Sequence, residues 1–489
     1  MVVTTILLAC VLEAVALGAI MISIALPSIL EEFPTDQGGW LLSTYYLAGA
    51  VAAPILGKCA DLYGKKRMLL ITMGISGLGI IVAVLAPSFG VLLIGRTMQG
   101  VILATLSLTY SLIRDIFPPK PAAFAASITV TGMGIFGIVT PLLVGILIAA
   151  FGWRGMFGFD AVWTLGLLLL IAVVVPESSL RRKARPDILG GVLLALGVVG
   201  ILLYVSLGRQ LGWVSLVSLA SLIGGIAFFT WFLLHTRRVA EPIIDGSLFR
   251  RRPVIFVVLF GAVGYALSAT IGQLMPLLAL TSAEDGGTYG LGLTTVEYAA
   301  VETPRAIAAA AVGILLGILV ARGRSPRMFM VLGMSFWLAA TLWLIFFNDT
   351  QYFLTIGALL IGTGGGMVNA SLPNVVIQAT PADNQGSVAG TVQLCQTGFG
   401  AVAPVLMFAI LAPYAMPSST GGIVYQETGF TIWLTCAAVT AAVLLLLAAT
   451  VLRPRKGDVV SPLLVSGKRA AATEGGGEGV REPAGQPTT

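Results

Sequence analysis

Residues 57–67 read Gly-Lys-Cys-Ala-Asp-Leu-Tyr-Gly-Lys-Lys-Arg and place five charged side chains between two apolar runs, 38–57 and 68–86. A helix of roughly 20 mostly apolar residues crosses a bilayer core about 30 Å thick, and each run has about that length. The stretch is therefore expected to form a short charged turn between two membrane-spanning helices.

The rest of the chain is also more apolar than a soluble protein. Of its 489 residues, 57% are hydrophobic and 10% charged, and the mean hydropathy is +0.97. An ordinary soluble chain is about 45–50% apolar and about 25% charged, so water-soluble, disordered and collagen-like classes are excluded. We expect an all-α membrane protein with fourteen transmembrane helices, at 3–26, 38–57, 68–86, 90–113, 121–149, 156–175, 188–207, 214–234, 254–280, 296–320, 328–347, 352–379, 386–412 and 430–451.

Basic residues follow the even-numbered runs. The connections after the second, fourth, sixth, eighth, tenth and twelfth runs carry 4, 2, 4, 5, 3 and 0 Lys and Arg, and the tail after Leu452 carries 6. The opposite connections carry two, Arg154 and Arg209. Because basic loops stay in the cytoplasm, we expect a multi-pass protein of the cell (cytoplasmic or inner) membrane with both termini cytoplasmic. The net charge of +6 then reflects topology and lipid contact, and no nucleic-acid partner is expected.

An internal repeat relates the two ends of the chain. Residues 57–67 have a counterpart at 317–327, again ten residues from Gly to the final Arg, and Ser107-Leu108 precedes Thr140-Pro141 much as Ser371-Leu372 precedes Ala403-Pro404. Such repeats are typical of transporters. We expect an N-terminal six-helix bundle at 1–180, two inserted helices with cytoplasmic linkers at 181–250, a C-terminal six-helix bundle at 251–452, and a disordered cytoplasmic tail at 453–489.

Enzymatic chemistry finds little support in the sequence. His235 is the one histidine, no CxxC pair exists, and no nucleophile–base pair or metal cluster is visible. Gly364-Gly365-Gly366 lacks the Lys-Ser/Thr of a phosphate loop, and helix packing explains it better. We expect no enzyme, no metal and no cofactor, with an ion gradient, most simply of protons, as the energy source.

Several charged residues interrupt the apolar runs, and four of them are candidates for proton coupling: Glu13, Arg96, Glu302 and Arg305. A charge at the bilayer centre costs about 2.5–3.5 kcal/mol on insertion scales, so each is expected to face the protein interior. Glu13 is either a proton carrier or a structural acid bonded to a neighbouring helix. Glu302 and Arg305 lie on one helix face, where they pair with each other or form a switch at which a proton or substrate competes for Glu302. Arg96 needs a partner, such as Gln99, a carbonyl oxygen or a carboxyl of another helix.

Other polar side chains in the runs are candidates to line a substrate cavity. An apolar span avoids such groups unless they have a role, and aromatic rings with a few polar groups suit amphipathic, often cationic ligands. The candidates are Tyr45, Tyr46, Gln273, Asn369, Asn374, Gln393 and Gln396.

Three motifs resemble the major facilitator superfamily, in particular its fourteen-helix drug:proton antiporter branch, and the resemblance covers nearly the whole chain except the tail. The loop motif of that superfamily matches Gly57, Ala60, Asp61, Gly64, Lys65 and Arg67. Its fourth-helix motif R-x-x-Q-G matches Arg96, Gln99 and Gly100. The glycine-rich antiporter motif of the fifth helix resembles Gly132, Gly134, Gly137, Pro141 and Gly145, with Thr140 where a glycine usually precedes the proline.

The resemblance implies two six-helix bundles that rock around a central site, with the charged loop latching them in the outward-facing state. Asp61 would then pair with Arg114 or with a helix N-terminus, and Gly57 and Gly64 would allow close helix approach and a tight turn. The resemblance also assigns proton transfer to Arg96. One position departs from the branch: where an acidic residue usually precedes the end of the first helix, this chain has Gly18. Glu13, the acid present, faces about 140° away at 100° per residue.

We therefore expect a monomeric secondary transporter that exports amphipathic drugs or toxic organic compounds by proton-coupled alternating access. Two alternatives remain open. One is a carrier of a single metabolite, and the other is a non-transporting membrane receptor or scaffold on the same fold.

Overall fold

The computed structural model describes residues 2–178, 187–239, 242, 252–282, 290–379, 385–417 and 423–450. Its first part contains α1 (Val2–Glu32), α2 (Trp40–Tyr63), α3 (Lys65–Val84), α4 (Phe89–Gly100), the 3₁₀ segment η1 (Val101–Ala104), α5 (Thr105–Ile116) and α6 (Pro119–Val174). The pair α7 (Ile188–Leu211) and α8 (Leu216–Thr236) follows. The last part contains α9 (Arg252–Leu280), α10 (Thr295–Ala321), α11 (Pro326–Phe346), α12 (Gln351–Ala379), α13 (Gln385–Leu411), η5 (Ala412–Tyr414), β1 (Ala415–Pro417), β2 (Ile423–Tyr425) and α14 (Glu427–Ala449). The two strands form a small antiparallel hairpin.

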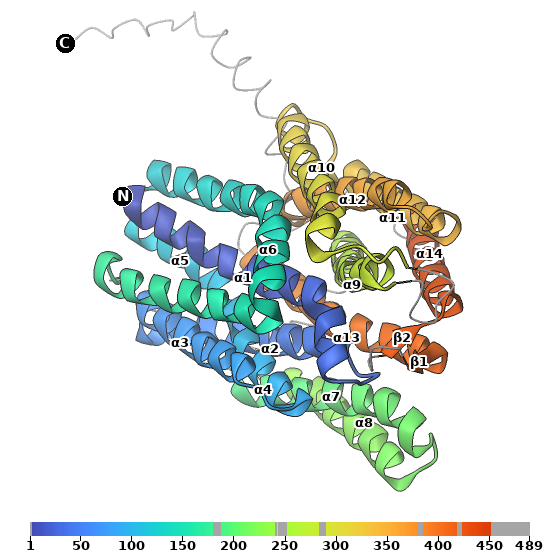
Figure 1. The fold of residues 1–489 in the computed structure, drawn as a ribbon. Helices are drawn as coiled ribbons and strands as arrows, with labels where there is room; N and C mark the ends of the chain where they lie inside the picture. The colour runs from blue at the N-terminus through green and yellow to red at the C-terminus, as the bar shows by residue number, and fades with distance from the viewer. Residues whose placement is uncertain are drawn as a thin grey trace, which may run out of the picture.

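The helices pack as two groups with a helical pair at the edge. Within the first group α1 packs on α6, and α3 on α4 and α6; within the second, α10 and α11 pack on α12, and α9 on α13. The pair α7 and α8 pack on each other, and α7 also contacts α2 and α13. Figure 1 shows the first group in blue to teal-green and the second in yellow to red, with the light-green pair α7 and α8 beside them. We call these the N half (α1–α6) and the C half (α9–α14).

Thirteen helices in the described part of the chain are long and apolar enough to cross a membrane, against fourteen runs expected from the sequence. The difference lies in α6, which contains both 121–149 and 156–175. Its backbone leaves helical geometry at Gly152, where φ is 67° and ψ is −178°, a conformation that glycine adopts readily and other residues avoid. The two runs are thus separated by a kink and not by a loop.

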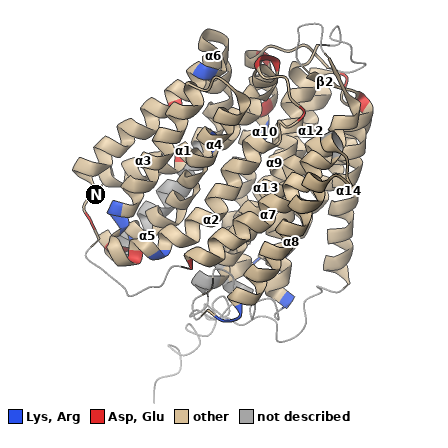
Figure 2. Cartoon of the chain, turned by 90° about the horizontal axis from the view of Figure 1, so that it is seen from below, with Lys and Arg blue, Asp and Glu red and all other residues tan. Residues whose placement is uncertain are grey.

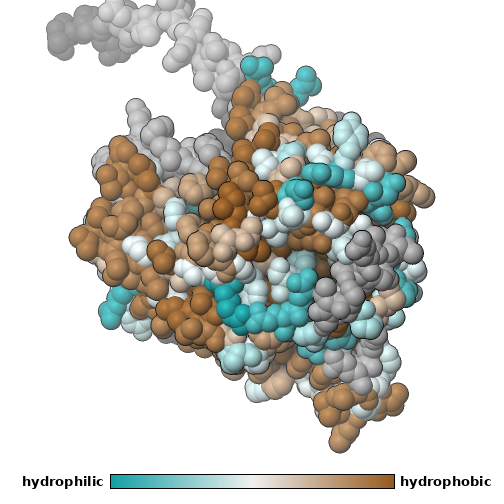
Figure 3. Space-filling view, in the orientation of Figure 1, coloured by the Kyte–Doolittle hydropathy of each residue, from teal (hydrophilic) through white to brown (hydrophobic). Residues whose placement is uncertain are grey.

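Charge and apolar surface are distributed as in a membrane protein. Most buried residues are aliphatic or aromatic, while large apolar side chains such as Val173, Val214 and Leu216 are exposed on the outside. Figure 2 shows the coloured charged residues gathered toward the ends of the helices, with a mostly uncharged middle. In Figure 3 brown apolar side chains occupy much of the outline and polar ones gather nearer the centre of the visible face. The chain is therefore a multi-pass integral membrane protein.

The two halves press together at the end where α2 begins, the side expected to face outward. A Cβ added to Gly39 would lie 2.5 Å from the carbonyl oxygen of Pro404 on α13, and one added to Gly145 would lie 2.7 Å from that of Thr295 on α10. The hydroxyl of Thr295 also donates to the carbonyl of Gly145 at 3.2 Å. At the other ends of α2 and α13, nothing lies within 4 Å of a Cβ added to Gly57 or Gly390. This conformation is closed on the expected outer side.

Candidate functional site

Arg96 donates hydrogen bonds to groups on three helices of the N half. It is fully buried on α4, where Nε donates to the carbonyl of Leu41 on α2 at 3.1 Å and Nη2 to the carbonyl of Gly18 on α1 at 3.0 Å. Nη1 donates to Oε1 of Gln99 at 2.5 Å, and the guanidinium lies 4.6 Å from the ring centroid of Tyr45. Two of the partners expected from the sequence, Gln99 and backbone carbonyls, are confirmed. Arg96 ties α4 to α1 and α2.

Asp160 completes this cluster and was missed by sequence reasoning. It is buried on α6, and its Oδ2 accepts a hydrogen bond from Nε2 of Gln99 at 2.7 Å. The hydroxyl of Thr164 donates to Oδ1 at 3.3 Å. The signal was present in the sequence, because Asp160 is the one charged residue in the run 156–175. A buried cation and a buried carboxyl are thus joined through one amide, and we call Arg96, Gln99 and Asp160 the relay cluster.

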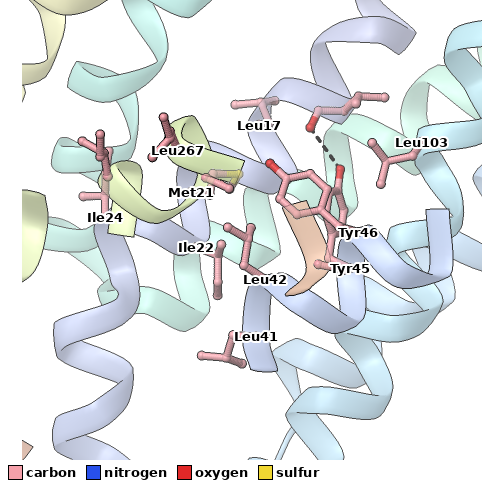
Figure 4. Close-up of a cluster of buried hydrophobic side chains, with 14 of the residues drawn as sticks. Leu17, Met21, Ile22, Ile24, Leu41, Leu42, Tyr45, Tyr46, Leu103 and Leu267 are labelled. Atoms are coloured by element: carbon pink, nitrogen blue, oxygen red, sulfur yellow. Dashed lines mark hydrogen bonds between the residues drawn. The ribbon is translucent and has the colours of Figure 1, made fainter. Parts of the chain in front are cut away.

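Gly18 occupies a place with no room for a larger side chain. An added Cβ would lie 2.9 Å from the hydroxyl oxygen of Tyr45. That hydroxyl donates to the carbonyl of Val15 at 3.0 Å, so Tyr45 is held in place, and Figure 4 shows its ring beside that of Tyr46 among the surrounding aliphatic side chains. Here the Tyr45 ring fills the space beside Arg96 that a side chain at position 18 would enter.

Glu13 lies apart from the relay cluster. Its side chain is 1% exposed, and neither carboxyl oxygen has a hydrogen-bond partner among the residues that the structure describes. The sequence left open a structural hydrogen bond to a neighbouring helix, and among the described residues no such bond to Glu13 is formed. An ionised Glu13 would be uncompensated here.

A cavity of about 210 Å³ lies between the two halves, bounded by α1, α2, α9 and α10. Its wall includes Ala19, Ile20, Ser23, Ile24, Leu42, Tyr46, Tyr265, Ser268, Ala269, Gly272, Tyr298, Glu302 and Arg305. The rings of Tyr46 and Tyr265 meet edge to face across the two halves, with centroids 5.3 Å apart. The wall is therefore aromatic, with a few hydroxyls and one charged pair.

That charged pair is Glu302 and Arg305. Nε of Arg305 donates to Oε1 of Glu302 at 2.6 Å, and the hydroxyl of Tyr298 lies 3.3 Å from Oε2. The pairing within one helix face, one of the two interpretations from sequence, is the geometry observed. Because both residues line the cavity, a charged ligand there would compete with this pair.

Of the seven side chains expected to line a cavity, Tyr46 does so and Tyr45 lies behind it against Arg96. Gln273 is fully buried without a hydrogen-bond partner for its amide among described residues, and Asn374 donates to the carbonyl of Ala370. Asn369 is exposed, Gln393 is half-buried and Gln396 is buried, all away from this wall. Sequence reasoning missed Tyr265, Ser268 and Tyr298, since aromatic and small polar residues in a span do not reveal which side they face.

The charged loop makes its contacts within the N half. Lys65 forms an ion pair with Asp115 and lies 4.0 Å from Asp61, and the backbone amides of Lys66 and Arg67 donate to the carboxylate of Glu177 at 2.9 and 3.0 Å. Gly64 makes the expected turn, with φ of 116°.

Two expectations for this loop differ from the conformation observed. Arg114, expected to pair with Asp61, has a side chain that is 66% exposed and lies 3.8 Å from its neighbour Asp115. Asp61, near the end of α2, instead faces Lys65, the first residue of α3. The expected close helix approach at Gly57 is also absent, because nothing lies within 4 Å of an added Cβ there. Both differences occur at the end where the halves are not pressed together.

The glycine-rich motif of the fifth span lies in α6. Gly145 makes the close contact with α10 already described, whereas Gly137 faces open space and Pro141 lies inside the helix. Gly132 and Gly134 lie within 119–135, whose surroundings are outside the described residues. In the fourth-span motif, Gly100 is needed for helix packing, because an added Cβ would lie 2.1 Å from the carbonyl oxygen of Tyr45.

Known proteins resemble this chain in sequence and in fold. Residues 7–404 match the family model described as Major Facilitator Superfamily. "Multidrug resistance protein Stp" of Mycobacterium tuberculosis is 30% identical over 384 residues, which cover 76% of this chain and 69% of that protein. "Multidrug resistance protein 3" of Bacillus subtilis is 24% identical over 368 residues, 73% of this chain and 69% of that one.

Two solved structures show the same fold at low identity. A POT family transporter in complex with 5-aminolevulinic acid superposes with a TM-score of 0.67 at 11% identity, covering 92% of this chain and 96% of the other. A bacterial homologue of the human lysosomal transporter Spinster, in an inward-facing and unoccupied conformation, superposes with a TM-score of 0.63 at 14% identity, covering 94% and 98%. Motifs, helix arrangement, family model and relatives agree, and the chain belongs to the major facilitator superfamily, in its multidrug efflux branch.

Proposed function

We propose that this protein exports small amphipathic organic compounds across the cell membrane in exchange for protons. The observation that carries the proposal is the cavity of about 210 Å³ between the halves, lined by Tyr46, Tyr265 and Tyr298 and by the pair Glu302–Arg305. Aromatic faces attract organic cations, and buried charged groups orient a polar end of a ligand. Two relatives with the printed name "multidrug resistance protein" support the same substrate class.

Alternating access is the mechanism we propose for this export. The halves touch at the ends of α2 and α6 that are expected to face outward, and opening would require parting Gly39 from Pro404 and Gly145 from Thr295. In the reverse state, the loop 57–67 would approach the C half, and Asp61 and Arg114 would be free to change partners. Both termini are placed in the cytoplasm in this proposal, and the protein acts as a monomer without a cofactor.

A second candidate function is a carrier of one metabolite, and the charged pair in the cavity supports it. The pair Glu302–Arg305 offers a carboxylate and a guanidinium side by side, which would suit a single compound with complementary charges. A non-transporting receptor or scaffold has no comparable support, because intramembrane charges lower stability without serving that role.

The test uses purified protein in liposomes with an imposed pH gradient and a pH-sensitive dye in the lumen. Lipophilic cations such as tetraphenylphosphonium and ethidium are added one by one. If the protein is a multidrug:proton exchanger, several unrelated compounds should each drive proton movement across the liposome membrane. Proton movement with a single compound of a broad metabolite panel would favour the single-substrate carrier. No proton movement with any compound would contradict the antiport proposal.

A further inference from the structure

We infer that Asp160 is the carboxyl whose protonation is coupled to the cavity, through Gln99 and Arg96, an inference that rests on the proton exchange proposed above. Asp160 and Arg96 are both buried, on α6 and α4. The amide of Gln99 presents its oxygen to the guanidinium and its NH₂ group to the carboxylate, at 2.5 and 2.7 Å. This orientation links the two opposite charges without direct contact.

Arg96 connects this pair to the cavity wall. The two carbonyls that it holds belong to Gly18 and Leu41, and the next residues in sequence, Ala19 and Leu42, line the cavity. A second link passes through Tyr45, whose ring lies under Arg96 and 5.5 Å from the ring of Tyr46. Tyr46 in turn lines the cavity and contacts Tyr265 of the C half. A change in the position of Arg96 would therefore displace the wall at three points.

Protonation of Asp160 would change the balance of charge around Arg96. The groups that face the cluster are Tyr45 on α2, the Gly18 carbonyl on α1, Thr164 on α6, and Ser76 on α3, which donates to the backbone carbonyl of Gln99. Asp160 is the one carboxylic acid in this cluster and its described neighbours. A proton on Asp160 leaves the charge of Arg96 buried without a counter-ion, a costly state that favours a conformation in which Arg96 finds water or another anion.

Glu13 and Glu302 fit this role less well. Glu13 is as buried as Asp160, but its oxygens have no hydrogen-bond partner among the described residues and thus no link to a cation. Glu302 lies in the cavity itself, paired with Arg305 where a ligand can reach it. The geometry therefore assigns proton binding to Asp160 and substrate binding to the pair Glu302–Arg305 on α10.

The test compares Asp160→Asn with Glu13→Gln, a matched control because both acids are buried in the N half. Each variant is reconstituted in liposomes and assayed for exchange of labelled against unlabelled tetraphenylphosphonium, which needs no proton, and for substrate-driven proton movement. We expect Asp160→Asn to retain exchange and to lose substrate-driven proton movement. Glu13→Gln should retain both, and Asp160→Glu should restore proton movement.

A pH profile separates a proton site from a structural role. In wild type, acidification should weaken tetraphenylphosphonium binding, since proton and substrate compete in an exchanger, and the Asp160→Asn profile should be flat. Coupling that survives in Asp160→Asn overturns the inference. If wild type itself moves no protons, the proposed function fails first. Should Asp160→Asn not fold, the double variant Arg96→Met/Asp160→Asn removes both charges, and its substrate-driven proton movement should likewise be lost.

Discussion

Among the described residues, Arg96 and Trp337 have the two largest side chains that are completely buried. Arg96 lies in the N half and Trp337 in the C half. Arg96 donates three hydrogen bonds, to the carbonyls of Leu41 and Gly18 and to the side-chain oxygen of Gln99. Trp337, on α11, makes one, from its indole nitrogen to the carbonyl of Ile361 at 3.0 Å, and fills the space above Gly264 and Gly364. The repeat that aligns Ser107 with Ser371 puts Leu360, next to Ile361, where Arg96 stands.

The comparison shows that the fold does not need a charge at this place. The C half packs the equivalent region with an indole ring, which contributes mostly apolar burial. The N half uses a guanidinium, whose desolvation is offset only by good hydrogen bonds and a carboxyl partner. A buried charge that the sister half replaces with an apolar group is best explained by function, which is why we place the proton in the N half.

Arg96→Met should be the most damaging single change. It leaves Asp160 buried without its counter-charge, and removing one partner of a buried pair costs about 3–5 kcal/mol. The thermal unfolding midpoint of the purified protein in detergent should drop sharply. Adding Asp160→Asn should recover part of the lost thermal stability. If the double variant were no more stable than Arg96→Met, Asp160 would not be the counter-charge of Arg96.

Trp337→Phe should cost about 2 kcal/mol, because the carbonyl of Ile361 loses its donor and part of the ring volume is lost. Thermal unfolding measures the loss. The same variant should leave the ratio of protons to substrate unchanged in liposomes, in contrast to changes at the relay cluster. A change in that ratio would show that the C half shares in proton coupling.

Gly18→Ala should cost about 1 kcal/mol, since the new methyl group meets the hydroxyl of Tyr45 and forces a small displacement. Tyr45→Phe removes that oxygen but keeps the ring carbons 3.2 Å away, so the double variant should regain part of the stability lost by Gly18→Ala. Unfolding curves of the four proteins form the cycle. An equal penalty with Phe at position 45 would mean that the steric account of Gly18 is wrong.

Glu302→Gln should have a smaller effect on stability than Arg96→Met, because Arg305, whose side chain is 24% exposed, lines the cavity and can be hydrated when it loses its partner. Its effect should fall on ligand affinity, measured by titration of tetraphenylphosphonium against the purified protein. Affinity for a lipophilic anion should rise in the same variant, since Arg305 is released. Unchanged affinity for both ions would remove the pair from the substrate site.

The sequence was sufficient for the fold class and for several single residues. Length and hydropathy predicted the membrane-spanning helices, and the search for a partner of Arg96 predicted Gln99 and a backbone carbonyl. The kink at Gly152 was not predicted, because a glycine between two apolar runs is equally compatible with a loop.

The connections between helices could not be read from one chain. Asp160 is visible as a charge in an apolar run, but its link to Arg96 depends on how α4 and α6 pack. The cavity residues Tyr265 and Tyr298 depend likewise on helix rotation, which hydropathy does not report. The partners of Asp61 and Arg114 depend on the conformational state as well as on sequence.

Proton release on ligand binding tests the division of labour between the halves most directly. Tetraphenylphosphonium is mixed with the detergent-purified protein in weak buffer, and a pH indicator follows the solution for wild type, Asp160→Asn and Glu302→Gln. The account predicts release by wild type, none by Asp160→Asn, and release at higher ligand concentration by Glu302→Gln. Undiminished release by Asp160→Asn, or loss of release at saturating ligand in Glu302→Gln, would contradict it.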